Sequence, residues 1–119
     1  VTCNAINNMY ATLTQKYFGK DVKLSDTLKF EWSRIPHFYT SFYVYKYATG
    51  LISALAITNK ILKGYKQSVK NYRNFLKSGS TKPPVELLKD AGVDLTKEET
   101  FTNAFDFINS ILDEWEKLL

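Results

Sequence analysis

The sequence predicts an all-α protein, and three observations support this fold class. Apolar residues recur at intervals of three and four in several segments, which places them on one face of a helix. Residues that commonly begin or end helices, such as Ser, Pro and Gly, stand at the borders of these segments. No segment shows a convincing strand pattern, and no internal repeat or low-complexity tract is present.

Two helices are expected in the first third of the chain. The first is followed by Gly19, a residue type that is common just beyond a helix C-terminus. Its apolar face comprises Ile6, Met9, Tyr10, Leu13 and Tyr17. The second is short, because Ser25 is a good N-cap and Pro36 pushes the preceding residue out of the α region. Its apolar face comprises Leu28, Trp32 and Ile35.

Residues 38–59 are expected to form one long helix, because no turn motif interrupts them and they exceed the length of an ordinary strand. Lys46 is their only charged residue. The segment is long enough to span a membrane. Its tyrosines, Lys46 and its scattered hydroxyl residues argue against such a span, so no membrane partner is expected.

A helix that is apolar all round is usually buried on all sides in a large protein. The other helices of this chain are short and amphipathic, and they offer too little surface to enclose residues 38–59. The pattern therefore predicts that the remainder of a longer chain completes the packing. It also predicts that the isolated chain associates with itself. The start at Val1 rather than Met likewise favours a piece of something longer.

Three more helices are expected towards the C-terminus. Residues 65–76 follow Gly64, and residues 85–91 form a short helix ended by Gly92, with a turn-rich loop between the two. Thr96 and Glu99 form a capping-box pattern for the last helix. The apolar stripe of that helix comprises Phe101, Phe105, Ile108, Leu112, Trp115 and Leu119.

Charge and cysteine content exclude some functions. The net charge of +4 is what a solubilising surface carries, so no nucleic-acid partner is expected. A series of basic residues predicts a solvated helix face, and the weaker alternatives are a stripe that attracts peptides or nucleic acid, or a nucleic-acid-binding domain. Its members are Lys60, Lys63, Lys66, Lys70, Arg73 and Lys77. Cys3 is the only cysteine, which rules out an intrachain disulfide and fits a cytoplasmic location.

Metal-dependent hydrolysis is not expected from these residues alone. His37 is the only histidine, whereas an H-E-x-x-H zinc site needs two imidazoles one helical turn apart. No G-x-S-x-G elbow or Gly-rich phosphate loop is present either. We therefore expect no metal ligand in this chain, no bound cofactor and no catalysis by the chain alone.

Tyrosines gather next to His37. Tyr43 and Tyr47 lie four residues apart and would share a face of the expected helix, and Tyr39 would extend that face by one turn. A row of phenol hydroxyls on a rigid element can hold a peptide carbonyl or stabilise the oxyanion that forms when water attacks it. The alternative is that these rings pack in or beside a core with their hydroxyls at its rim.

The chain resembles the C-terminal end of zinc oligoendopeptidases of the oligoendopeptidase F type, within the thimet oligopeptidase-like family. The strongest similarity is in residues 34–39 (RIPHFY) and 42–50 (FYVYKYATG). Further similarity covers residues 16–19 (KYFG), 75–79 (FLKSG) and 84–96 (PVELLKDAGVDLT). Ser80 departs from the pattern, which has a second Gly there. If that position requires a positive φ, Ser would cost about 1 kcal/mol.

The resemblance implies that residues 1–119 form a single helical C-terminal fragment of a peptidase catalytic domain. It further implies a zinc ion held by an H-E-x-x-H helix upstream of Val1, and oligopeptide substrates. His37 and Tyr43 match the catalytic His and Tyr that face the metal. Tyr47, Tyr39 and Tyr45 match substrate-binding residues. A non-catalytic all-α module that binds a partner through its tyrosine-rich helix is the rival hypothesis.

Overall fold

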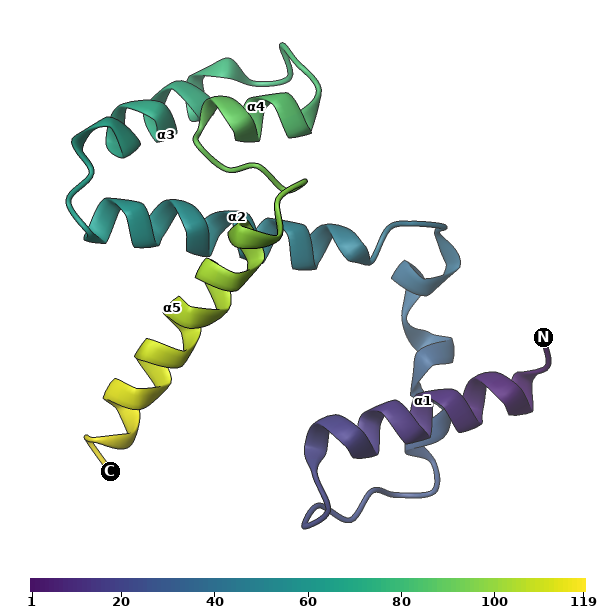
Figure 1. Cartoon of the computed structure of the whole chain (residues 1–119). Helices are drawn as coiled ribbons and strands as arrows, with labels where there is room; N and C mark the ends of the chain where they lie inside the picture. Colours follow the sequence, from purple (N-terminus) through teal and green to yellow (C-terminus); the bar gives the residue numbers. More distant parts are fainter. The chain divides into compact units, whose positions relative to one another are not determined.

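The computed structural model describes residues 1–119 and confirms the all-α class, with five α-helices, two 3₁₀ helices and no strand. The helices are α1 (Cys3–Phe18), η1 (Leu28–Arg34), η2 (Pro36–Tyr39), α2 (Tyr45–Leu62), α3 (Lys66–Ser78), α4 (Pro84–Asp90) and α5 (Glu98–Glu116). They form two compact units, Val1–Val44 and Tyr45–Leu119 (Figure 1). None of the helices combines the length and the hydropathy that crossing a membrane requires.

The first unit consists of α1 packed against η1, with η2 following η1. Thr2 caps α1 by accepting a hydrogen bond from the Ala5 amide, and Gly19 ends the helix with φ 83°. The predicted first helix is therefore confirmed, together with its Gly terminator. The buried side chain of Asn7 accepts a hydrogen bond from the Trp32 indole at 2.7 Å, which ties α1 to η1.

The second helix differs from the prediction in type and in its start. Residues 28–34 are 3₁₀-helical, and no side chain caps them. The Ser25 hydroxyl pairs with that of Thr27, and the Ser25 carbonyl accepts from the Leu28 amide. Ser25 thus forms a local turn, an alternative that Ser side chains offer in competition with capping. Pro36 ends η1 as expected and then starts η2, where the missing amide proton of a proline is harmless.

The expected helix over residues 38–59 begins seven residues later, at Tyr45, and continues to Leu62. Residues 36–39 form η2, and the chain then turns before α2. Phe42 adopts φ 56°, a left-handed conformation that an α-helix cannot accommodate. Consequently Tyr39, Tyr43 and Tyr47 do not share one helix face. Tyr39 lies in η2, Tyr43 in the turn and Tyr47 in α2.

Helix α2 buries one face within these 119 residues. Ile52, Ser53, Ala56 and Ile57 are buried, whereas Leu51 and Leu62 are exposed. Ala56 and Ile57 form the core of the second unit together with Ala91 and Val93. The expectation that short helices surround α2 also needs one qualification, because α5 has 19 residues and α2 has 18.

The other helices of the second unit are arranged around α2. Helix α3 packs against α2 and α4 against α3, while the first part of α5 packs against α2 (Figure 1). Ala104 of α5 is completely buried, but every residue from Asn109 to the C-terminus is exposed. Gly79 takes the positive φ after α3 and Ser80 does not, so the departure from the family pattern carries no left-handed strain.

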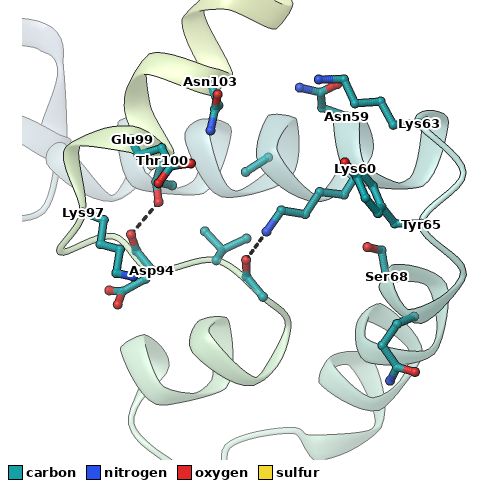
Figure 2. A pocket seen from close by; sticks show the side chains of 14 residues that line it. Asn59, Lys60, Lys63, Tyr65, Ser68, Asp94, Lys97, Glu99, Thr100 and Asn103 are labelled. Carbon is teal, nitrogen blue, oxygen red and sulfur yellow. Dashed lines mark hydrogen bonds between the residues drawn. The ribbon is translucent and has the colours of Figure 1, made fainter.

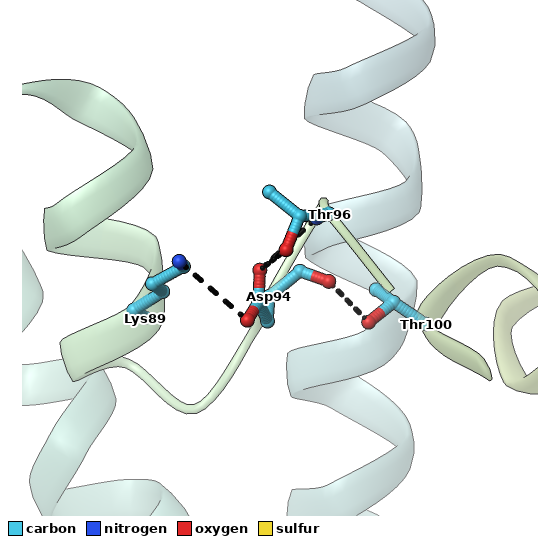
Figure 3. A network of polar contacts seen from close by, with 4 residues as sticks. All are labelled: Lys89, Asp94, Thr96 and Thr100. Atoms are coloured by element: carbon cyan, nitrogen blue, oxygen red, sulfur yellow. Dashed lines mark hydrogen bonds and ion pairs between the residues drawn. The ribbon is translucent and has the colours of Figure 1, made fainter. Parts of the chain in front are cut away.

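The predicted capping box at the start of α5 is wrong. The N-cap is Lys97, with no side-chain hydrogen bond. Asp94 engages Thr96 instead: its carboxylate accepts from the Thr96 amide at 3.0 Å and from the Thr96 hydroxyl at 2.7 Å (Figure 3). Lys89 approaches the same carboxylate at 3.6 Å, and Thr100 donates to the Asp94 carbonyl. Asp94 thus organises the connection between α4 and α5.

We predict a pH-dependent contribution of Asp94 to stability. The two hydrogen bonds from Thr96, with help from Lys89, hold the pKa of Asp94 below its ordinary value of 3.8. The ionised form is therefore favoured in the folded state. Its stabilising effect is complete above the unfolded-state pKa of about 4 and is lost as the pH falls through the lowered folded-state pKa.

Two substitutions at this position separate hydrogen bonding from charge. Asp94→Ala should lower the urea midpoint of unfolding most at neutral pH, and Asp94→Asn should lower it less because its amide oxygen still accepts from Thr96. The difference between the wild-type chain and Asp94→Asn should shrink below about pH 4. An unchanged difference at about pH 2.5 would contradict this prediction.

Large exposed apolar residues lead us to predict that the isolated chain self-associates. The outer part of α5 exposes Leu112 and Trp115, the residues after it expose Leu118 and Leu119, and α2 exposes Leu51. Large exposed apolar areas are uncommon on a monomer. Sedimentation velocity over a range of concentrations should show species heavier than the 13.7 kDa monomer. A single monomeric species at high concentration would contradict the prediction.

Candidate functional site

His37 and Tyr43 meet in the first unit. Their ring centroids are 5.4 Å apart and their planes are inclined by 39°. His37 is exposed and Tyr43 is half-buried. Tilted aromatic pairs at this separation are favourable contacts. The two residues predicted from the sequence to be catalytic are therefore neighbours in the structure.

A tight backbone turn brings these two rings together. The Thr40 amide donates to the His37 carbonyl at 3.3 Å, and the Tyr43 amide donates to the Thr40 carbonyl at 3.2 Å. Phe42, inside the turn that the second bond closes, adopts φ 56°. A left-handed conformation costs a residue with a Cβ about 1–2 kcal/mol. The Phe42 side chain is 86% exposed, so packing within this chain does not offset that cost.

Two hydrogen bonds support the segment that carries His37. The Asn7–Trp32 bond holds η1 against α1, as described above. The Tyr39 hydroxyl donates to the Ser33 carbonyl at 2.7 Å and so folds η2 back towards η1. An ion pair between Glu31 and Arg34 lies on the exposed side of η1. His37 therefore stands on a short element that is tied to its neighbours at both ends.

The other three predicted residues differ in what they offer. Tyr39 is exposed, but its hydroxyl proton is already donated to Ser33. In this conformation it offers a ligand its ring and its oxygen lone pairs. Tyr45 and Tyr47 lie in the first turn of α2, in the second unit, and both are exposed.

The larger cavity of the second unit involves none of the predicted site residues. It measures about 620 Å³ and is lined by α2, α3, the α4–α5 connection and α5 (Figure 2). Lys60 lines this cavity and donates a hydrogen bond to the Gly92 carbonyl. This lysine, which belongs to the basic series predicted to be solvated, therefore has a structural role. Lys63 and Lys97 also line the cavity. Its position gives no support for a catalytic role.

The donor set of this chain does not fit the zinc that the family resemblance implies. No three His, Cys, Asp or Glu side chains gather into a possible metal site. Cys3 is exposed at the start of α1, and His37 contacts an aromatic ring. A structural or catalytic zinc site takes three or four such ligands.

Sequence reasoning missed the turn at Phe42. The sequence predicts one helix over residues 38–59 because no turn motif interrupts them and they exceed the length of an ordinary strand. The adjacent Thr40 and Ser41 were the available signal, since hydroxyl residues favour turns. Sequence reasoning also missed Asn7, which lies outside the predicted apolar face of α1 but is the buried residue of that helix and accepts the hydrogen bond from Trp32.

Comparisons with known proteins give one consistent result. The model of peptidase family M3 matches residues 1–107. The chain is 44% identical, over its whole length, to the oligopeptidase PepF of Bacillus subtilis (strain 168), and 37% identical to the chromosomal oligoendopeptidase F of Lactococcus lactis subsp. cremoris. It spans 18% and 20% of the lengths of these two relatives.

The fold agrees with a solved relative. The crystal structure of oligoendopeptidase-F from Enterococcus faecium matches 97% of this chain with a TM-score of 0.85 and 40% sequence identity. The match covers 22% of that protein. A match of sequence and of fold along nearly the whole chain is far more specific than a shared motif. The chain belongs to peptidase family M3.

Proposed function

We propose that residues 1–119 form the C-terminal part of the catalytic domain of a zinc-dependent oligoendopeptidase that cleaves peptide bonds in oligopeptides. The observation that carries this proposal is the contact between His37 and Tyr43, at 5.4 Å, inside the segment most similar to oligoendopeptidase F. Family membership supports the reaction class. The paired rings support a direct role of this segment in handling the substrate.

The chemistry assigned to the pair is hydrogen bonding to the reacting carbonyl. Addition of water to a peptide carbonyl places negative charge on its oxygen. A phenol hydroxyl such as that of Tyr43 can donate to this oxygen, and such a donor lowers the barrier most when it is held in place beforehand. His37 packs against the Tyr43 ring, so it can orient that ring and also present an imidazole nitrogen to the substrate.

The remaining tyrosines are assigned to peptide binding. Tyr45 and Tyr47 are exposed on the first turn of α2, where a phenol can hydrogen-bond a backbone carbonyl and cover an apolar side chain. Tyr39 contributes chiefly its exposed ring, because its hydroxyl supports η2. Binding of the peptide at several points would position the scissile bond.

The parent enzyme requires zinc in this proposal, and the ion is held by residues outside this chain. Zinc would polarise the carbonyl and activate water there. The rest of the parent chain is accordingly the main partner of these 119 residues. It would also cover the exposed apolar residues of α2 and α5. A cytoplasmic location fits the single unpaired cysteine.

The isolated chain should have no peptidase activity, even with zinc added. Its single histidine and the absence of a gathered ligand set leave no way to hold a catalytic metal. The measurement is cleavage of an internally quenched oligopeptide by the purified chain, with stoichiometric zinc. Activity that depends on the metal and is abolished by a chelator would contradict the proposal.

A matched experiment tests the positive part of the proposal. The upstream part of the parent, produced without these residues, should also be inactive, and mixing it with this chain should restore cleavage. Restoration should fail when the added chain carries Tyr43→Phe and should succeed when it carries Tyr17→Phe, an exposed tyrosine of α1. Full activity of the upstream part alone would show that this chain does not contribute to the site.

A further inference from the structure

Phe42 combines two features that no structural need of this chain explains. It is the only residue other than glycine with a positive φ. Its ring is also among the most exposed apolar side chains, at 86%. Glycine, Asn or Asp usually occupies such a position, because a bulky residue there is a genuine outlier. Strained backbone of this kind persists where it serves a site.

The place of Phe42 in the chain indicates what its backbone does. It lies inside the second of two successive turns, which are closed by the hydrogen bonds from Thr40 to His37 and from Tyr43 to Thr40. These turns bring the ring centroids of Tyr43 and His37 to 5.4 Å from each other. An ordinary right-handed or extended backbone at Phe42 would send Tyr43 in another direction. The left-handed conformation is therefore a condition for the pair.

The identity of the residue indicates what its side chain does. Backbone geometry alone would favour Gly or Asn at this position. Phe42 directly precedes Tyr43 in the sequence, and its exposed ring offers an apolar surface in the same turn. A peptide whose carbonyl reaches Tyr43 has a side chain within reach of such a ring.

We propose that Phe42 is a further residue of the site: its left-handed backbone positions Tyr43 against His37, and its ring binds an apolar side chain of the peptide substrate. The inference rests on the proposed function of Tyr43. It also has consequences that Tyr43 does not share. The backbone role depends on whether the residue tolerates a positive φ, and the ring role depends on the side chain of the substrate.

Two variants of the full-length parent separate these roles. Phe42→Asn and Phe42→Ile both remove the ring, but Asn tolerates the left-handed region and a β-branched residue does not. Phe42→Asn should raise KM about three- to tenfold for peptides with an apolar side chain, and keep kcat within about threefold. Phe42→Ile should in addition lower kcat about 10- to 100-fold, because Tyr43 is displaced.

Substrate pairs and a double variant sharpen the test. The KM effect of Phe42→Asn should disappear for a peptide whose apolar residue is replaced by Ser. Adding Tyr43→Phe to Phe42→Ile should lower kcat little beyond Tyr43→Phe alone, because both changes remove the same donor. Thermal melting of each variant shows whether it is folded. If Phe42→Asn lowers the melting temperature and leaves KM unchanged for every peptide, then the rest of the protein covers the ring and the substrate-binding role is wrong.

A spectroscopic measurement keeps this inference separate from the proposed function. The histidine resonances of the labelled parent include that of His37, identified by its loss in His37→Ala. Tyr43→Ala gives the His37 shift without the neighbouring ring. Phe42→Ile should move the resonance towards that value, and Phe42→Asn should not. Suppose that Phe42→Ile and Phe42→Asn give the same His37 shift and the same kcat, while Tyr43→Phe lowers kcat. This result would overturn the role of Phe42 and leave the role of Tyr43 standing. Wild-type kcat in Tyr43→Phe would overturn the proposed function instead.

Discussion

Tyr43→Phe should lower kcat of the full-length parent by about 10²- to 10³-fold, or roughly 3–4 kcal/mol, with little change in stability. The substitution keeps the ring that contacts His37 and removes only the hydroxyl. If that hydroxyl donates to the developing oxyanion, its loss raises the energy of the transition state and leaves the folded state almost unaffected. Steady-state kinetics and thermal melting measure the two effects separately.

Two other tyrosines serve as controls for this variant. Tyr17→Phe, at an exposed position of α1, should leave both kcat and the melting temperature unchanged. Tyr39→Phe removes the hydrogen bond to Ser33 and should cost about 1 kcal/mol of stability with a smaller effect on kcat. Wild-type kcat in Tyr43→Phe together with a lowered melting temperature would assign Tyr43 to packing.

His37→Ala should lower kcat/KM of the parent by about 10²-fold or more while the bound zinc is retained. The imidazole contacts Tyr43, and no three possible metal ligands of this chain gather into a site. In the proposed mechanism, removal of the imidazole takes away a group that faces the substrate, and it also removes the ring against which the Tyr43 ring packs. Metal analysis of the purified variant, alongside kinetics, separates a substrate role from a metal-ligand role.

A conservative variant and a double variant make this prediction sharper. His37→Gln keeps an N–H donor on a side chain of intermediate length and should recover part of the lost activity. His37→Ala combined with Tyr43→Phe should show less than the sum of the two single effects, because the rings are in contact. Loss of zinc from His37→Ala would show that His37 acts on the metal.

The sequence contained enough information for the fold class and for most helices. Helices α1, α3, α4 and α5 follow from apolar spacing and from Gly or Pro at their borders, which are local signals read within one or two turns. The family was predicted from several motifs that occur in the family's order along the chain, and the comparisons confirm this prediction. His37 and Tyr43 were selected as a pair from the same motifs, and the structure brings their rings together.

Three-dimensional packing decided how that pair is built. The spacing predicts that Tyr39, Tyr43 and Tyr47 share one helix, because no turn motif interrupts residues 38–59. The structure ends η2 at Tyr39 and begins α2 at Tyr45, with Phe42 left-handed between them. The Asn7–Trp32 hydrogen bond likewise joins residues 25 positions apart, and the ring contact between Tyr43 and His37 forms only once the chain turns between them. Residue patterns within one or two helical turns do not reveal such contacts, because only folding brings these side chains together.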